Sequence, residues 1–142
     1  MTRISRCSEA LLAKARIGVV SDPHTGPLHA RVRDLAAAGV PVALGQDDIA
    51  DAYYPFGRNN MLEVAFLAAH LLWMTTSAEM ELLYDFISTR AAEALGLRRR
   101  TLEIGSVADL VVLGAESVSE ALTSHEPPLH VIKNGREVTV RG

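Results

Sequence analysis

The sequence predicts an α/β protein in which a βαβ unit comes first and a strand-rich segment comes last. Two near-continuously apolar runs, 17–20 and 40–44, flank a stretch whose apolar residues have helical spacing, which is typical of parallel strands covered on both faces. After about residue 97 the chain changes to short β-branched runs separated by turn residues. With 142 residues, 49% of them hydrophobic and 22% charged, the composition is that of one globular domain.

Hydrophobic spacing assigns the elements of the first half. Apolar residues at near-helical spacing predict a helix over 5–16, and the β-branched run 17–20 predicts a buried strand. Helical spacing returns over 28–38 and stops at Gly39, the residue type expected just past a helix C-terminus. The apolar run 40–44 then predicts a second strand, parallel to the first and joined to it through the helix.

A long polar and aromatic loop follows the second predicted strand. It covers 45–58, and long loops after strands often carry functional residues. Asn60 is expected to cap a helix over 60–74, with Glu63 three residues on as in a capping box. Another helix is expected over 78–95, because acidic residues fill its first turn and a glycine follows it.

Short strands make up the last part of the chain, beyond a boundary near 97–101. The expected strands are 102–105, 109–113, 129–132 and 137–141. A short helix is expected over 116–124, and Asn134-Gly135 predicts a hairpin turn between the last two strands.

Composition and charge exclude several classes of function. Fourteen Lys and Arg against seventeen Asp and Glu leave a net charge of -3, unlike the basic surface of a nucleic-acid-binding protein. The apolar runs fall short of the roughly 20 residues that a membrane span needs, and no secretory signal follows Met1, so a cytoplasmic protein is expected. The single Cys7 excludes an intramolecular disulfide, and the glycine spacing of a nucleotide-binding loop is absent.

Asp47 and Asp48 form the sharpest local feature. They follow a predicted buried strand, at the carboxyl end where α/β folds place their sites. Adjacent acids point in different directions, so one carboxylate can act as a metal ligand or proton carrier while the other orders the loop. The same pair also suits the start of a turn, and the residues alone leave both interpretations open.

A hydrolytic metal site would need several histidines, and the chain has five without the spacing of a metal motif. They are His24, His29, His70, His125 and His130. No HxH or HExxH pattern occurs among them. His24 lies in the loop after the first predicted strand, where it can face the same edge as Asp47, whereas His70 is interpreted as a core residue.

One long segment resembles a known family. Residues 42–64, which read VALGQDDI at their start and include YYPFG and NMLEV, resemble the eighth strand and following loop of cytosine deaminases in the amidohydrolase superfamily. Residues 17–23 are similar to the seventh strand of these enzymes. Residues 102–113 and 131–138 resemble the C-terminal β-segment of the same superfamily.

The resemblance implies a partial (β/α) barrel carrying the last two strand–helix units in residues 1–97, followed by a small C-terminal β-segment in 98–142. It implies a metal-dependent hydrolase in which a divalent ion, Fe or Zn, activates water for the deamination of a nucleobase-like ring. Asp47 then takes the place of the metal ligand and catalytic proton shuttle, and Asp48 and Tyr53 those of substrate-pocket residues. Cytosine, isocytosine, creatinine and a triazine stay open as substrates.

The rest of the family's metal site has no counterpart in this sequence. Its HxH pair and its other histidines and glutamate lie on earlier strands, so we expect the chain alone to be inactive. The alternative is a non-catalytic α/β module kept as an oligomerisation or binding surface. Because the helix predicted over 60–74 is apolar nearly all round, a homo-oligomer is expected in either case. Nucleic-acid and membrane partners are not expected.

Overall fold

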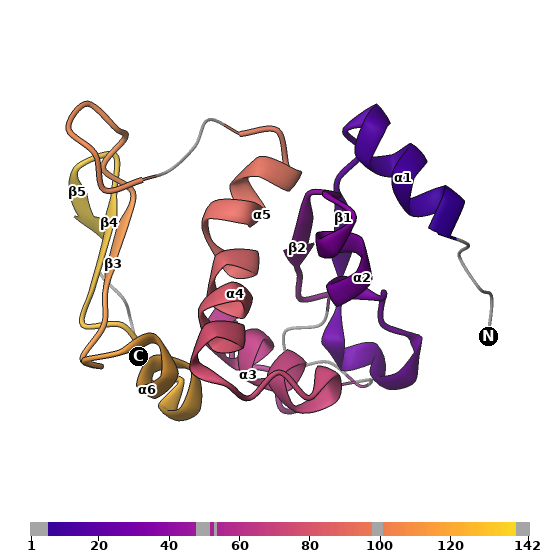
Figure 1. Cartoon of the computed structure of the whole chain (residues 1–142). Coiled ribbons are helices and arrows are strands. Elements are labelled where there is room, and N and C mark those ends of the chain that lie inside the picture. Colours follow the sequence, from indigo (N-terminus) through magenta and orange to yellow (C-terminus); the bar gives the residue numbers. More distant parts are fainter. Residues whose placement is uncertain (1–5, 48–51, 53, 98–100, 139–142) are drawn as a thin grey trace.

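The computed structural model describes residues 6–47, 52, 54–97 and 101–138 of the chain (Figure 1). The helices are α1 (Arg6–Ala15), the 3-10 helix η1 (Pro23–Leu28), α2 (Val32–Ala37), α3 (Met61–Leu72), α4 (Ser77–Ile87), α5 (Thr89–Ala94) and α6 (Val118–Ser124). The strands are β1 (Val19–Ser21), β2 (Val42–Leu44), β3 (Leu110–Val112), β4 (His130–Lys133) and β5 (Arg136–Val138). Figure 1 shows helices α4 and α5 lying between a two-stranded sheet on one side and a three-stranded sheet on the other.

The first sheet is the predicted parallel pair. Val19 lies opposite Val42 and Ser21 opposite Leu44, which confirms the parallel pairing of the two apolar runs. All three residues of β2 are buried, because β2 packs against α2, α4 and α5. The first strand begins at Val19 rather than at residue 17, where Ile17 is half exposed.

The segment between the two strands differs from the single helix predicted over 28–38. A 3-10 helix comes first, and α2 begins only at Val32. Within η1, Gly26 has φ 58° and ψ -121°, a conformation outside any right-handed helix. Gly39, with φ 79°, directly follows the C-cap residue of α2 and so has the role predicted for it.

Helix α3 agrees with the helix predicted over 60–74. The side chain of Asn60 caps it by accepting a hydrogen bond from the backbone N–H of Leu62 at 3.0 Å. The helix ends at Trp73, which has φ 54° and is 82% exposed. No helix in the described part of the chain is long and apolar enough to cross a membrane.

The single helix predicted over 78–95 is instead divided into α4 and α5 at Ser88. The Ser88 hydroxyl donates a hydrogen bond to the carbonyl of Tyr84 at 2.7 Å, and Ser88 itself has φ -130° and ψ -99°. A serine side chain that bonds the preceding turn competes with the helix backbone, which accounts for the break. The start of α4 is sharply defined by a capping box between Thr76 and Glu79.

The second sheet is antiparallel, with the order β3-β4-β5. Asn134 and Gly135 connect β4 and β5 with positive φ values of 51° and 72°, as predicted for this hairpin turn. The strand predicted at 137–141 is β5 as far as Val138, and the residues beyond it lie outside the described part of the chain.

The strand predicted over 102–105 is wrong. These residues form bends and turns, and Leu102 and Ile104 are almost fully exposed. Gly105 has φ 92°, which is incompatible with a continuous strand. A short apolar run becomes a strand only where a neighbouring strand pairs with it, and the described sheet has none beside this segment.

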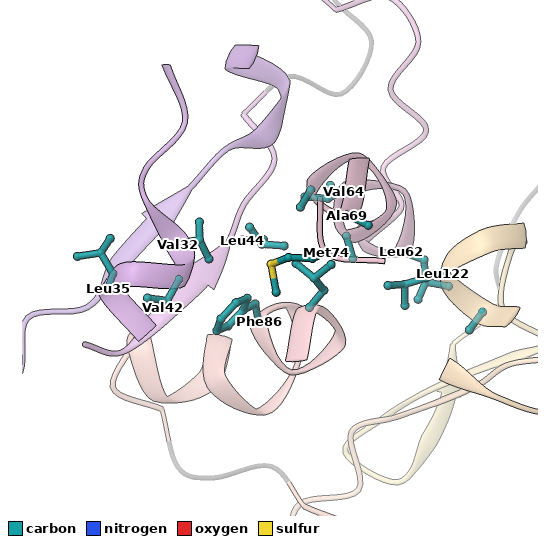
Figure 2. Packing of buried hydrophobic residues seen from close by; sticks show 14 of the residues in the cluster. Val32, Leu35, Val42, Leu44, Leu62, Val64, Ala69, Met74, Phe86 and Leu122 are labelled. Atoms are coloured by element: carbon teal, nitrogen blue, oxygen red, sulfur yellow. The ribbon is translucent and has the colours of Figure 1, made fainter. Parts of the chain in front are cut away.

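The core lies where α3, α4, β2 and α6 meet (Figure 2). Its largest fully buried side chains are Phe86, Met74, Leu83, Leu122, Val32, Val42 and Val64. Leu122 belongs to α6, which packs against α3 and α4, so this helix shares the core of the first half. The division into 1–97 and 98–142 stays a prediction.

Candidate functional site

The candidate site lies at the edge where β1 and β2 both end. Because the two strands are parallel, Ser21 and Leu44 mark the same edge of the sheet. The segment after β1 begins with Asp22, and the segment after β2 carries Asp47. Carboxyl ends of neighbouring parallel strands are the usual place for catalytic groups in α/β folds.

Asp47 lies three residues beyond the end of β2, in a bend, and is exposed to solvent. The chain leaves β2 through Gly45, where a Cβ atom would come within 2.7 Å of the Val20 side chain. A side chain at this position would force the Val20 side chain to move. Asp48 and Tyr53, predicted to line the substrate pocket, lie outside the described residues. The proposed metal and proton-transfer roles of Asp47 stay predictions.

A buried histidine–carboxylate pair follows β1. Asp22 Oδ1 accepts hydrogen bonds from the backbone N–H of His24 at 2.9 Å and from His24 Nδ1 at 2.6 Å. A carboxylate can only accept, so Nδ1 carries a proton, and in the neutral ring Nε2 then holds a lone pair. The His24 side chain is fully buried, and its Nε2 has no hydrogen-bond partner among the described residues. Asp22 was missed by the sequence reasoning, although Asp before Pro is a familiar helix-start signal.

Aromatic rings connect this pair to the loop after β2. The rings of His24 and Tyr54 lie edge to face, with centroids 4.2 Å apart and planes at 71°. Tyr54 in turn makes an edge-to-face contact with Phe56 at 5.8 Å. Burial raises the pKa of the Tyr54 hydroxyl above its ordinary value, and the nearby carboxylate of Glu63 raises this pKa further.

Glu63 is a buried carboxylate in the first turn of α3. Its Oε2 accepts a hydrogen bond from the backbone N–H of Arg58 at 3.3 Å and lies 3.6 Å from Arg58 Nε. The expected capping box with Asn60 is therefore replaced by a bond to the loop, and Asn60 Nδ2 donates to the carbonyl of His125 at 2.7 Å. Glu63 thus fixes the far end of the loop that carries Asp47.

The described residues do not by themselves make a metal site. Within them, no three side chains of His, Cys, Asp or Glu gather around a common point. His29 Nδ1 bonds the carbonyl of Gly26 at 2.5 Å, and His130 pairs with Glu137 on the other sheet. Asp47 offers one carboxylate, whereas a catalytic zinc-type site takes about three protein ligands and an open position. The residues present therefore fit a part of such a site only.

Comparisons with known proteins agree on one family. A model described as the amidohydrolase family matches residues 8–139. The N-isopropylammelide isopropyl amidohydrolase of Pseudomonas sp. (strain ADP) is 34% identical over 117 residues, covering 82% of this chain and 28% of that protein.

Solved structures give the same result. N-isopropylammelide isopropylaminohydrolase from Burkholderia multivorans ATCC 17616 superposes with a TM-score of 0.87 at 27% identity, covering 94% of this chain and 34% of that one. 5-Methylcytosine deaminase from Klebsiella pneumoniae, liganded with 5-fluorocytosine, gives 0.82 at 28% identity, covering 96% and 36%. The chain spans about a third of the length of these relatives.

Proposed function

Because this chain belongs to the amidohydrolase family, we propose that it forms the last two strand–helix units and part of the β-subdomain of a metal-dependent hydrolase. The proposed reaction is hydrolytic removal of an amino group from a nucleobase-like nitrogen heterocycle. The observation that carries this proposal is the match over 8–139 together with an exposed acid, Asp47, just beyond the end of β2. Relatives that act on N-isopropylammelide and 5-methylcytosine support a small heterocyclic substrate.

The proposed chemistry gives Asp47 two tasks. Family members use divalent metals such as zinc, and such an ion, when bound, lowers the pKa of a coordinated water. Water adds to the ring carbon that bears the amino group, the C–N bond breaks, and ammonia leaves as the carbonyl forms. Water must lose a proton and the departing amine must gain one, and a carboxylate at Asp47 can carry that proton between them. The other metal ligands would come from strands that this chain does not contain.

A second candidate is a non-catalytic module that binds a second copy of itself. The observation that favours it is the exposure of large apolar side chains, including Trp73 at 82% and Leu28 at 84%. Large apolar groups left in water are typical of interfaces when they form a contiguous patch. This candidate predicts a dimer that contains no metal and releases no ammonia from any heterocycle.

Joining this chain to the first two-thirds of a related amidohydrolase tests the proposal. Ammonia release and metal content are measured for the joined protein, for this chain alone, and for the intact relative as positive control. We expect activity and bound metal in the joined protein and neither in the chain alone.

Two variants then test the role of Asp47. Asp47→Asn should abolish ammonia release and weaken metal binding. Asp34→Asn is the matched control, because Asp34 is a half-exposed carboxylate on α2 that pairs with Arg31 and has no role in the proposed reaction. Full activity of Asp47→Asn would refute the role of Asp47, whereas a metal-free dimer without activity in every form would favour the second candidate.

A further inference from the structure

The side chain of Asn60 connects two helices that are distant in the sequence. Its Oδ1 accepts a hydrogen bond from the backbone N–H of Leu62 at the start of α3 at 3.0 Å, and its Nδ2 donates one to the carbonyl of His125, just after α6, at 2.7 Å. We propose that this second bond, the Asn60 bridge, fixes the end of α6 and the end of the loop before α3 in one arrangement. Asn60 is then a positioning residue for both segments. The proposed function does not require this role, so either proposal can fail without the other.

The two contacts of Asn60 also determine which way its amide points. A rotated amide would place its oxygen against the carbonyl oxygen of His125 and its nitrogen against the N–H of Leu62, so that like groups would face each other at both ends. Aspartate, serine and threonine also cap helices, but among these residue types only asparagine carries an N–H donor beside its acceptor. The bridge therefore depends on the residue type, whereas the cap alone does not.

Both ends of the bridge contain a residue with a side chain in the left-handed conformation. Asn59, directly before Asn60, has φ 54°, and His125 has φ 37° and ψ 42°. This conformation is uncommon outside glycine and persists where the surrounding structure holds it. At His125 the backbone N–H donates to the carbonyl of Ala121 at 2.9 Å, and the carbonyl accepts from Asn60. The bridge is thus a contact from outside α6 that holds this part of the backbone.

Apolar contacts attach α6 to the core without fixing where it ends. Leu122 is fully buried where α6 packs against α3 and α4, and the ring of Phe66 on α3 has its centroid 5.0 Å from that of His125. Hydrophobic contacts have no preferred direction, whereas a hydrogen bond needs both the right distance and the right angle. The bridge therefore supplies the directional part of this attachment.

A groove of about 700 Å³ lies between the helices and the three-stranded sheet beside the bridge. Asn60 and His125 line it, together with Tyr84, Ile87, Val111 and Val131. Val111 is 57% exposed, so close packing does not fix the sheet at this place. The chain runs from α6 through Pro127 and Pro128, whose rings restrict their φ angles, to β4 (Figure 1). The place where α6 ends therefore determines where β4 begins.

On its other side the bridge meets the last part of the loop after β2. The backbone N–H of Glu63 donates to the carbonyl of Asn60 at 3.1 Å, and the Glu63 carboxylate accepts from the backbone N–H of Arg58 at 3.3 Å. Arg58, Asn60 and Glu63 thus belong to one continuous hydrogen-bonded turn, every residue of which the structure describes. A change in the place of Asn60 should therefore reach Arg58 directly.

Amide hydrogen exchange of the whole chain, followed by ¹⁵N NMR, tests the proposal. Asn60→Ser keeps a side-chain oxygen that can cap α3 but loses the N–H donor. Exchange at Arg58 and His125 should then rise about fivefold, the factor expected from losing one hydrogen bond, while the capped N–H of Leu62 keeps its protection. Asn60→Asp has the shape of asparagine and also lacks the donor, so it should give the same pattern. Asn60→Ala loses cap and bridge, and all three amides should exchange faster.

Thr76→Ser is the matched control, because Thr76 is the N-cap of α4 and its side-chain hydrogen bonds are made with Glu79 in the first turn of the same helix. This exchange of one capping residue for another should leave the amides of Arg58, Leu62 and His125 unchanged.

A second set of variants tests whether the two segments are connected through Asn60. Leu122→Val loosens the packing of α6 and leaves Asn60 in place, so the cross-peak of Arg58 should shift. In the double variant with Asn60→Ser this response should disappear, although α6 is loosened equally. An Arg58 amide that does not change in folded Asn60→Ser and Asn60→Asp would overturn the proposal, and so would an equal response to Leu122→Val with and without the Asn60 donor.

Discussion

Two histidine–carboxylate pairs of nearly equal length occur in very different surroundings. His24 Nδ1 lies 2.6 Å from Asp22 Oδ1 with its side chain fully buried, whereas His130 Nδ1 lies 2.5 Å from Glu137 Oε1 with both side chains more than half exposed. The first pair stands at the end of β1 beside the helical core, and the second lies on the three-stranded sheet. Burial determines how much such a pair contributes to the free energy of unfolding, because solvent screens the exposed pair and leaves its side chains free to separate.

The same contrast separates the two regions as wholes. In the first sheet every residue of β2 is buried against helices, and only Val20 of β1 is more than half exposed. The second sheet leaves Val111 and Val138 about half exposed. Substitutions of equal chemistry should therefore have large effects in the first region and small effects in the second.

The largest expected effect is on the core. Phe86 is fully buried in α4, and Phe86→Ala should lower the free energy of unfolding by about 3 to 5 kcal/mol through lost burial and the cavity left behind. Val111→Ala, in the exposed sheet, should cost about 1 kcal/mol or less. Urea denaturation followed by circular dichroism measures both, and similar losses for the two variants would contradict the proposed difference between the regions.

The next largest loss of stability is expected from an alanine substitution at Gly18, compared with the same change at Gly114. A Cβ added at Gly18 would lie 2.4 Å from the carbonyl oxygen of Ala94, so Gly18→Ala forces β1 and α5 apart. We expect a loss of about 1 to 3 kcal/mol, the usual cost of overpacking. At Gly114 the same atom would only touch the Leu129 side chain at 3.8 Å, so Gly114→Ala should be neutral or slightly stabilising. Melting temperatures by calorimetry compare the two, and a neutral Gly18→Ala would show that α5 packs less closely than described.

Substitutions in the two histidine–carboxylate pairs should give the third largest loss of stability. Asp22→Asn removes the charge from a buried hydrogen bond and should cost about 1 to 3 kcal/mol. Glu137→Gln makes the same change in the exposed pair and should cost about 0 to 1 kcal/mol. Raising the salt concentration should reduce the second loss more than the first. Equal losses with equal salt dependence would mean that burial does not distinguish the pairs.

Local patterns predicted the first region well. The two parallel strands and α3 were predicted from apolar spacing and from Asn60, because these signals lie within one element. The break at Ser88 was not predicted, since it depends on a hydroxyl that competes with the backbone for one carbonyl. The strand expected at 102–105 failed because pairing depends on neighbours that sequence periodicity does not reveal.

Only the parts of the candidate site that depend on neighbouring residues in the sequence were predicted. Asp47 was identified because it lies shortly after a buried strand, three residues beyond the end of β2. The contact between His24 and Tyr54 joins residues thirty positions apart, and no spacing rule brings them together. Asp22 carried a local signal, as an N-cap before Pro23, but that signal indicates a helix start and not a partner for a histidine.

The smallest expected effect belongs to a partly exposed carboxylate, Glu79, at the start of α4. Its Oε2 accepts hydrogen bonds from the backbone N–H of Thr76 at 3.1 Å and from the Thr76 hydroxyl at 2.8 Å. These bonds, the backbone one first, hold the pKa of Glu79 below its ordinary value of 4.5. As pH falls, the unfolded chain therefore takes up the proton first. The stabilisation is fully present above pH 4.5 and is lost as pH falls through the pKa of the folded state.

Glu79→Gln isolates this contribution, because glutamine cannot titrate. The difference in unfolding free energy between wild type and Glu79→Gln should be constant near neutral pH and should shrink below about pH 4.5. Urea denaturation at a series of pH values between about 6 and 3 measures it. A difference that stays constant through this range would mean that the carboxylate of Glu79 contributes nothing as a charge. Solvent screening would then cancel the stabilisation even of a partly exposed charge-assisted cap, and the contrast with the Asp22–His24 pair would be sharper than we expect.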